Sequence, residues 1–90
     1  ECNDIGYYMK GINMITLTFK LPGRQKTFTG EKEDDIFRNF LKDFGEVWED
    51  VVEVEQHNSW SNRVFNKSPS DFLRSIGWYW VDIKLAMEDL

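Results

Sequence analysis

Two side chains of this sequence titrate or react near neutral pH, the single histidine His57 and the single cysteine Cys2. Catalysis by such a group needs a second one, a nucleophile or a base, that the fold places within hydrogen-bond reach. His57 shares the side of an expected strand with Glu55 but nothing else suggests a site there, and Cys2 lies near the N-terminus with no base close to it in sequence. The sequence therefore predicts no enzyme, and we interpret His57 as a surface histidine at the end of a strand.

Ligands for a metal or a cofactor are equally few. Zinc sites use several His or Cys ligands, and this chain has one residue of each type. The carboxylates of residues 31–35 lack the glycine-containing turn that arranges oxygen ligands around calcium, and the chain has no glycine-rich phosphate loop. The sequence predicts neither a metal nor a cofactor.

Carboxylates are the more informative groups. The 90-residue chain has 16 acidic and 11 basic residues, a net charge of −5. Residues 30–56 alone contain ten acidic and three basic side chains, a net charge of −7. This distribution argues against direct binding to nucleic acid or to an anionic membrane, because both attract basic surfaces. It is compatible with a basic protein partner.

The sequence shows no apolar run long enough to span a membrane and no signal peptide. A single cysteine cannot form an internal disulfide, which favours a reducing, cytoplasmic location. Gly6 and Gly11 interrupt any period in residues 1–13, so we interpret this segment as an N-terminal arm or a remnant of processing or cloning. Residues 14–90 are expected to form a single α+β domain.

The elements that position the carboxylates follow from periodicity. A helix is predicted over residues 30–49, because its apolar side chains lie within an arc of about 140° when successive residues turn by about 100°. These side chains are Ile36, Phe37, Phe40, Leu41, Phe44, Val47 and Trp48. Thr29 or Gly30 is expected to cap this helix, and the acidic residues of its first turn suit the helix dipole.

The other acidic residues of this region need a different explanation. Four share the outer face of the helix, namely Asp35, Asp43, Glu46 and Asp50. Residues 51–56 alternate valine with glutamate, which predicts a strand whose outer side carries Glu53 and Glu55. We predict that the six carboxylates form one acidic face that binds a partner. The alternative is a solvated face that only keeps the protein in solution.

A second amphipathic helix is predicted over residues 68–90. Ser68 suits its N-cap position and Pro69 its first helical position. Its apolar face contains Phe72, Leu73, Ile76, Tyr79, Trp80, Ile83, Ala86, Met87 and Leu90. A rival interpretation ends the helix at Gly77 and makes residues 78–85 a strand, because that segment has strong β character. We favour the continuous helix because its period holds to the end of the chain.

Three apolar residues, Trp78, Val81 and Leu85, interrupt the polar side of this second helix. Their spacing of i, i+3 and i+7 places them in a separate stripe along the helix. Either another element of the same chain covers this stripe, or the stripe is a contact surface for a partner or for a second copy of the protein.

The remaining segments predict a small sheet. Residues 14–21 alternate apolar and polar side chains, as a half-buried strand does, and residues 25–29 return as a second strand. The Pro-Gly pair at 22–23 marks a turn, which we expect within a slightly longer loop. A short further strand is predicted at residues 64–65. The predicted fold is α+β in the order β-β-α-β-(β)-α, a small, mostly antiparallel sheet with two amphipathic helices packed on one face.

Together these features favour a small acidic, non-enzymatic protein-binding module whose acidic face meets the basic groove of a nucleic-acid-handling protein. In size and charge, though in no motif, the chain resembles inhibitors from mobile elements such as phages, including anti-CRISPR and anti-restriction proteins. The resemblance implies an inhibitor that mimics nucleic acid with carboxylates at phosphate positions. One alternative is a homo-oligomeric structural or regulatory protein that pairs through Trp78, Val81 and Leu85. A second alternative is a small-ligand-binding domain with an aromatic pocket.

Overall fold

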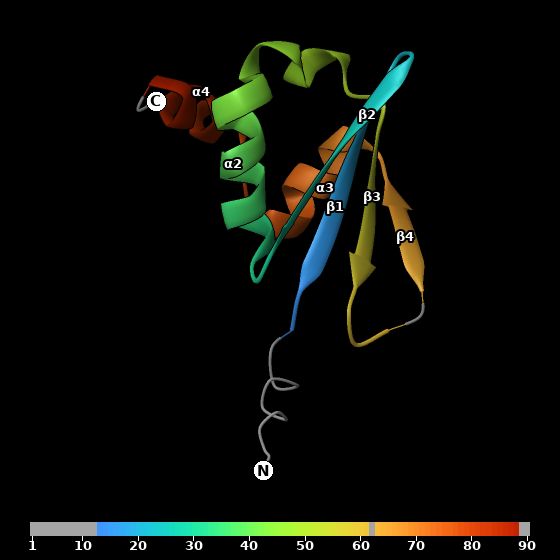
Figure 1. Cartoon of the computed structure of the whole chain (residues 1–90). Coiled ribbons are helices and arrows are strands. Elements are labelled where there is room, and N and C mark those ends of the chain that lie inside the picture. Colours follow the sequence, from blue (N-terminus) through green and yellow to red (C-terminus); the bar gives the residue numbers. More distant parts are fainter. Residues whose placement is uncertain (1–12, 62, 89–90) are drawn as a thin grey trace.

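The computed structural model describes residues 13–61 and 63–88, and within them it contains a four-stranded sheet, three α-helices and one 3₁₀-helix (Figure 1). The strands are antiparallel and lie in the order β2-β1-β3-β4. In chain order the elements are β1 Ile15–Leu21, β2 Arg24–Gly30, α2 Glu33–Phe44, η2 Gly45–Asp50, β3 Glu53–Asn58, β4 Val64–Lys67, α3 Pro69–Ile76 and α4 Trp80–Glu88. The predicted α+β class is confirmed. The predicted N-terminal arm falls almost wholly outside the described residues.

Strands β1 and β2 form a hairpin whose loop has only two residues, Pro22 and Gly23. Leu21 pairs directly with Arg24 across this loop. Gly23 has a φ of 76°, which glycine adopts without strain, and the ring of Pro22 fixes that residue's own φ. The expectation of a longer loop was wrong, because these two residues together supply the backbone angles that close the hairpin.

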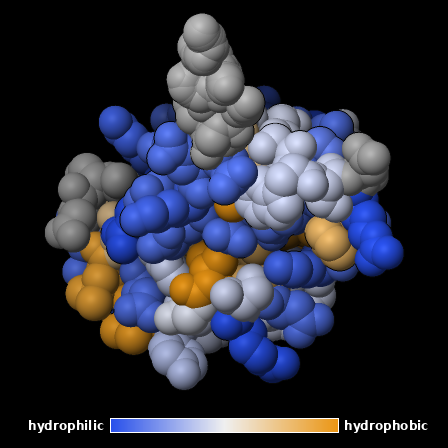
Figure 2. All heavy atoms as spheres, turned by 90° about the horizontal axis from the view of Figure 1, so that it is seen from below, coloured by the Kyte–Doolittle hydropathy of each residue, from blue (hydrophilic) through white to orange (hydrophobic). Residues whose placement is uncertain are grey.

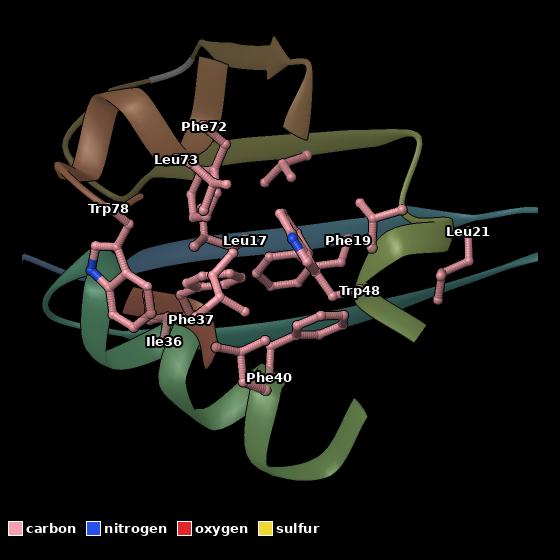
Figure 3. Packing of buried hydrophobic residues seen from close by; sticks show 14 of the residues in the cluster. Leu17, Phe19, Leu21, Ile36, Phe37, Phe40, Trp48, Phe72, Leu73 and Trp78 are labelled. Atoms are coloured by element: carbon pink, nitrogen blue, oxygen red, sulfur yellow. The ribbon is translucent and has the colours of Figure 1, made fainter. Parts of the chain in front are cut away.

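Phe19, in the middle of β1, is the centre of the hydrophobic core. Its ring stacks on Phe40 of α2 at 4.1 Å between centroids and meets Phe72 of α3 edge-on at 5.9 Å. Trp48 of η2 extends the cluster through an edge-on contact with Phe37 of α2 at 4.8 Å (Figure 3). Because α2 and α3 both contact Phe19, they cover the same face of the sheet, and aromatic burial holds the two layers together.

The opposite face of the sheet is polar. The hydroxyl of Thr16 in β1 hydrogen-bonds to that of Thr29 in β2 at 3.2 Å. The hydroxyls of Thr18 and Thr27 are joined in the same way at 3.1 Å. Strands that alternate apolar and polar side chains in this manner suit an antiparallel sheet that packs against helices on one side only.

The helix predicted over residues 30–49 is shorter and has two parts. The N-cap position of α2 is Lys32, which makes no side-chain capping hydrogen bond, so neither Thr29 nor Gly30 caps the helix. Both of these residues belong to β2 instead. From Gly45 the chain continues as the 3₁₀-helix η2. The tighter winding of η2 changes which of its side chains lie on the same side.

Strand β3 begins two residues later than predicted, at Glu53. Val51 is buried in the core, whereas Val52 is exposed. The buried residues of the strand itself are Val54 and Gln56. The predicted further strand is present as β4, which pairs with β3 at the edge of the sheet.

The predicted C-terminal helix is broken at Gly77. This residue has a left-handed φ of 75°, and the N–H of Trp78 donates to the carbonyl oxygen of Leu73 (2.9 Å), which is a standard way for a helix to end. The chain becomes helical again in α4, where the carboxylate of Asp82 accepts a hydrogen bond from the N–H of Tyr79 (2.7 Å). The continuous helix was therefore wrong at Gly77, and the rival strand was wrong beyond it.

Replacement of Gly77 tests how strongly the break between α3 and α4 depends on the left-handed backbone. A Cβ at this position meets nothing within 4 Å, so Gly77→Ala adds no clash and should act through backbone strain alone. We expect the free energy of unfolding in urea to fall by about 1–2 kcal/mol. Gly77→Asn should cost less, because asparagine tolerates this conformation better. Equal stability of Gly77→Ala and the wild type would contradict the assigned backbone.

Truncation of Phe19 tests the role of the aromatic cluster. Phe19→Ala should lower the free energy of unfolding by about 3–5 kcal/mol, because it removes a fully buried ring and leaves a cavity. Val52→Ala is the control, since Val52 is exposed and its truncation should change stability by no more than about 0.5 kcal/mol. Similar effects of the two substitutions in urea denaturation would show that Phe19 is not central.

Candidate protein-binding surface

Trp78, the first residue of the predicted contact stripe, is part of the core. It is only 8% exposed, its ring meets Phe37 edge-on at 5.0 Å, and the guanidinium of Arg38 lies 4.9 Å from the ring centroid. Helix α2 of the same chain therefore covers this residue. The other two members, Val81 and Leu85 of α4, remain exposed (58% and 55%). The predicted stripe is thus divided between the core and the surface.

Two aromatic residues that were expected in the core are exposed instead. Tyr79 and Trp80, at the start of α4, are 76% and 66% exposed. The break at Gly77 is the physical reason, because it interrupts the helical rotation. Side chains beyond the break therefore do not continue the apolar face of α3.

Helix α4 contacts the rest of the protein through one side. Ile83 is buried and Ala86 is half-buried against the core. Met87 packs on Gly45 of η2, where a Cβ would lie 3.0 Å from the methyl carbon of the methionine. The exposed side of α4 carries the large apolar side chains Trp80, Val81 and Leu85 beside the charged Lys84 and Glu88, and exposed apolar groups rimmed by polar ones often mark an interaction site. This exposed side is therefore a candidate contact surface.

A groove of about 680 Å³ lies between η2 and α4. Its apolar lining comes from both helices and consists of Gly45, Trp48, Trp80, Val81, Ile83 and Met87. The charged residues that line it are Glu46 and Glu49 of η2 and Lys84 of α4. In Figure 2, apolar surface gathers on the side of the molecule where Figure 1 places α4, next to hydrophilic surface. The groove therefore combines apolar and charged groups in one concave site.

The structure places four of the six predicted acidic residues on helical elements. Asp35 and Asp43 belong to α2, Glu46 and Asp50 belong to η2, and all four are exposed. Among residues 13–61 and 63–88, no ion pair involves any of these four carboxylates. Three of them, at positions 43, 46 and 50, lie around the junction of α2 and η2, close in sequence to the groove lining.

Glu53 and Glu55 belong to a different surface. They point to the polar face of the sheet, because Val54 between them is buried in the core. Both pair with Lys20 of β1, whose Nζ lies 3.4 Å from a carboxylate oxygen of Glu53 and 2.9 Å from one of Glu55. We had expected the acidic face of the helix to continue onto the strand. In the structure it does not.

Glu49 was not among the predicted site residues, although an α-helical period places it on the same outer face as Glu46. In a 3₁₀-helix, residues three apart lie one above the other, and Glu46 and Glu49 line the groove together. For Tyr79 and Trp80, the sequence signal that could have indicated their exposure was Gly77, because glycine is the residue that most often ends a helix.

The ion pairs of Lys20 have an electrostatic consequence. The hydrogen bond to Glu55 raises the pKa of Lys20 above its ordinary value of 10.5, and this effect outweighs the opposing one of desolvation. Glu53 adds to the increase. These three side chains therefore pair with one another within the sheet and not with an external ligand.

Gln56 is a polar residue buried on the core side of β3. Its side-chain nitrogen donates to carboxylate Oε2 of Glu33 at 3.2 Å and to Oδ1 of Asn58 at 3.0 Å. Its side-chain oxygen accepts a hydrogen bond from Nζ of Lys67 at 3.4 Å. Both polar atoms are thus satisfied, as buried polar groups require. This cluster joins the first turn of α2 to β3 and β4, and it has a structural role.

His57 is exposed on the polar face of the sheet, opposite Thr16 in the register of β1 and β3. Glu55 is on the same face but pairs with Lys20. In the described part of the chain, no group of three or more His, Cys, Asp or Glu residues is arranged to hold a metal ion. Cys2 lies outside the described residues.

The chain matches no protein-family model, and searches of curated proteins and of solved structures find no significant similarity. None of the helices in the described ranges combines the length and the apolar composition that crossing a membrane requires. Conclusions about function therefore depend on the surface itself.

The ion pairs of Lys20 can be tested through the pH dependence of stability. Because folding raises the pKa of Lys20, its stabilising effect is complete below the ordinary value of 10.5 and is lost as pH rises through the higher folded-state value. Lys20→Met should therefore lower the urea midpoint at neutral pH, and the difference from the wild type should shrink above pH about 11. Lys42→Met, which removes the same charge from an exposed position, is the control and should have little effect. A difference that persists unchanged at high pH would contradict the assigned ion pairs.

Proposed function

We propose that the protein is a protein-binding module that docks on a basic partner through the surface formed by η2 and α4. One observation carries the proposal: large apolar side chains are exposed on and next to α4, and two of them, Trp80 and Val81, line a groove together with acidic residues of η2. The apolar residues are Tyr79, Trp80, Val81 and Leu85. Contiguous exposed apolar surface rimmed by polar groups is typical of interaction sites.

The composition of this surface supports a protein partner. Tyrosine and tryptophan are enriched at protein interfaces, where they often contribute a large share of the binding energy. The exposed carboxylates of Glu46 and Glu49 add electrostatic attraction for a basic surface and increase the rate of encounter. The surface therefore offers both affinity and selection by charge.

A more specific form of the proposal is an inhibitor of the anti-CRISPR or anti-restriction type, acting in the cytoplasm on the basic groove of a nucleic-acid-handling protein. The exposed carboxylates of α2 and η2 support this form, because carboxylates and phosphates are bound by the same lysine and arginine side chains. Glu53 and Glu55 contribute less, since Lys20 already pairs with both.

Self-association is the second candidate function. Val81 and Leu85 lie one turn apart on the exposed side of α4, a spacing that would let two copies pair about a two-fold axis. A third candidate is the binding of a small apolar ligand, because the 680 Å³ groove has a volume typical of ligand sites, about 300–1,000 Å³.

Affinity capture from a cell lysate, with bound proteins quantified for each variant, tests the proposed surface. Val81→Ser and the double variant Glu46→Lys/Asp50→Lys should each lose most of the captured basic proteins, because they remove an apolar contact and reverse the local charge. Val64→Ser is the matched control, since Val64 of β4 is similarly exposed. Capture that is the same for all variants would contradict the proposal. Self-association would be favoured instead if the wild type sediments with the mass of two chains and Val81→Ser sediments with the mass of one.

A further inference from the structure

We infer that the groove between η2 and α4 is the binding site for a basic amphipathic helix of a partner protein. The inference rests on the proposed function and names the kind of segment that the groove takes. The groove holds about 680 Å³ and has apolar side chains on both walls, including Trp48 on η2 and Trp80 and Val81 on α4. An amphipathic helix binds in such a groove by inserting apolar side chains spaced three and four residues apart.

The nature of the walls argues against the other common mode of peptide binding. Addition of a β-strand needs an exposed sheet edge with unpaired backbone groups. Both walls of this groove are helical, and backbone groups within a helix are already hydrogen-bonded to each other. A partner segment must therefore satisfy its own backbone groups, as a helix does, and must bind through its side chains.

The charge of the walls selects a basic segment. Residues 42–50 and 80–88 together contain six carboxylates and two lysines, a net charge of −4, whereas the whole chain has a net charge of −5. Glu46 and Glu49 line the groove itself, and the basic residue among its lining side chains is Lys84. Lysine and arginine side chains on the polar side of a bound helix would meet these carboxylates.

The same charge opposes a second copy of this chain in the groove. In a two-fold pairing whose axis passes beside η2, the acidic segment 42–50 of one copy would approach the identical segment of the other. Like charges that meet in an interface oppose association. The carboxylates attract a basic helix and repel a second acidic copy. The charge therefore favours the basic helix as the occupant.

The test uses the full chain and a synthetic peptide of about 18 residues, which forms a helix about 27 Å long. The peptide has leucines on one side and lysines on the other, and a matched peptide has every lysine replaced by glutamate. We expect the lysine peptide to bind at least about tenfold more tightly in calorimetry. In nitrogen-15 NMR spectra it should shift the amide signals of Gly45, Val81 and Lys84.

Matched variants locate the binding. Val81→Ser should weaken binding of the lysine peptide by about fivefold or more through loss of apolar contact, whereas Val64→Ser should leave it unchanged. Glu46→Lys/Glu49→Lys should weaken it by about tenfold. Glu31→Lys/Asp34→Lys makes the same change in net charge around the N-terminal end of α2, about 15–20 Å away along the helix, and should weaken binding by less than about threefold.

Several results would overturn the inference. Equal binding of the two peptides, equal effects of the two charge-reversal pairs, or amide shifts outside the groove would each do so. A dimer that Val81→Ser converts into a monomer would also do so, because a second copy would then occupy the groove. If the peptide fails but Val81-dependent capture from a lysate persists, only the helix is wrong and the proposed function stands. If both fail, the proposed function fails as well.

Discussion

Stacking of aromatic rings around Phe19 is the interaction on which the rest of this structure depends. A single position of β1 contacts Phe40 of α2, Trp48 of η2 and Phe72 of α3. These rings come from the consecutive elements α2 and η2 and from the distant α3, and each buries a large area for one residue. A chain of 90 residues can bury only a modest core, so this concentration of aromatic side chains is what secures the two layers.

The size of this core also explains why α4 is left at the surface. Gly77 ends α3, Trp78 then fills the space beside Phe37, and the next helix begins at Trp80. Helix α4 is held by Ile83, by Ala86 and by the contact of Met87 with η2, and its remaining apolar residues have nothing left to cover them. The candidate binding surface is thus a consequence of where the core ends.

The acidic residues divide in the same way between internal and external roles. Glu33 accepts a hydrogen bond from buried Gln56, and Glu53 and Glu55 are held by Lys20. The carboxylates around η2 have no such partner among the described residues. Glu46 and Glu49 therefore lie beside exposed apolar residues of α4, and this juxtaposition is the basis of the proposed function.

The sequence by itself determined the α+β class and most of the elements. The apolar and polar alternation of β1, the buried face of α2 and the cap of α3, where Ser68 accepts a hydrogen bond from the N–H of Asp71 (3.2 Å), all arise from neighbours within a few residues. Such local patterns are legible because strand and helix geometry repeat over short distances. Of the candidate site, they placed Glu46 and Asp50 on an outer face, and they left open whether Val81 and Leu85 are covered or exposed.

Only the tertiary structure decided the rest. A helical wheel assumes constant winding, and it failed where Gly77 adopts a left-handed backbone, so Tyr79 and Trp80 came out on unexpected sides. The pairing of Lys20 with two glutamates depends on the register between strands more than 30 residues apart. The groove likewise joins residues of η2 and α4 that have no relation in sequence, and their proximity follows from how both helices pack at one end of the core.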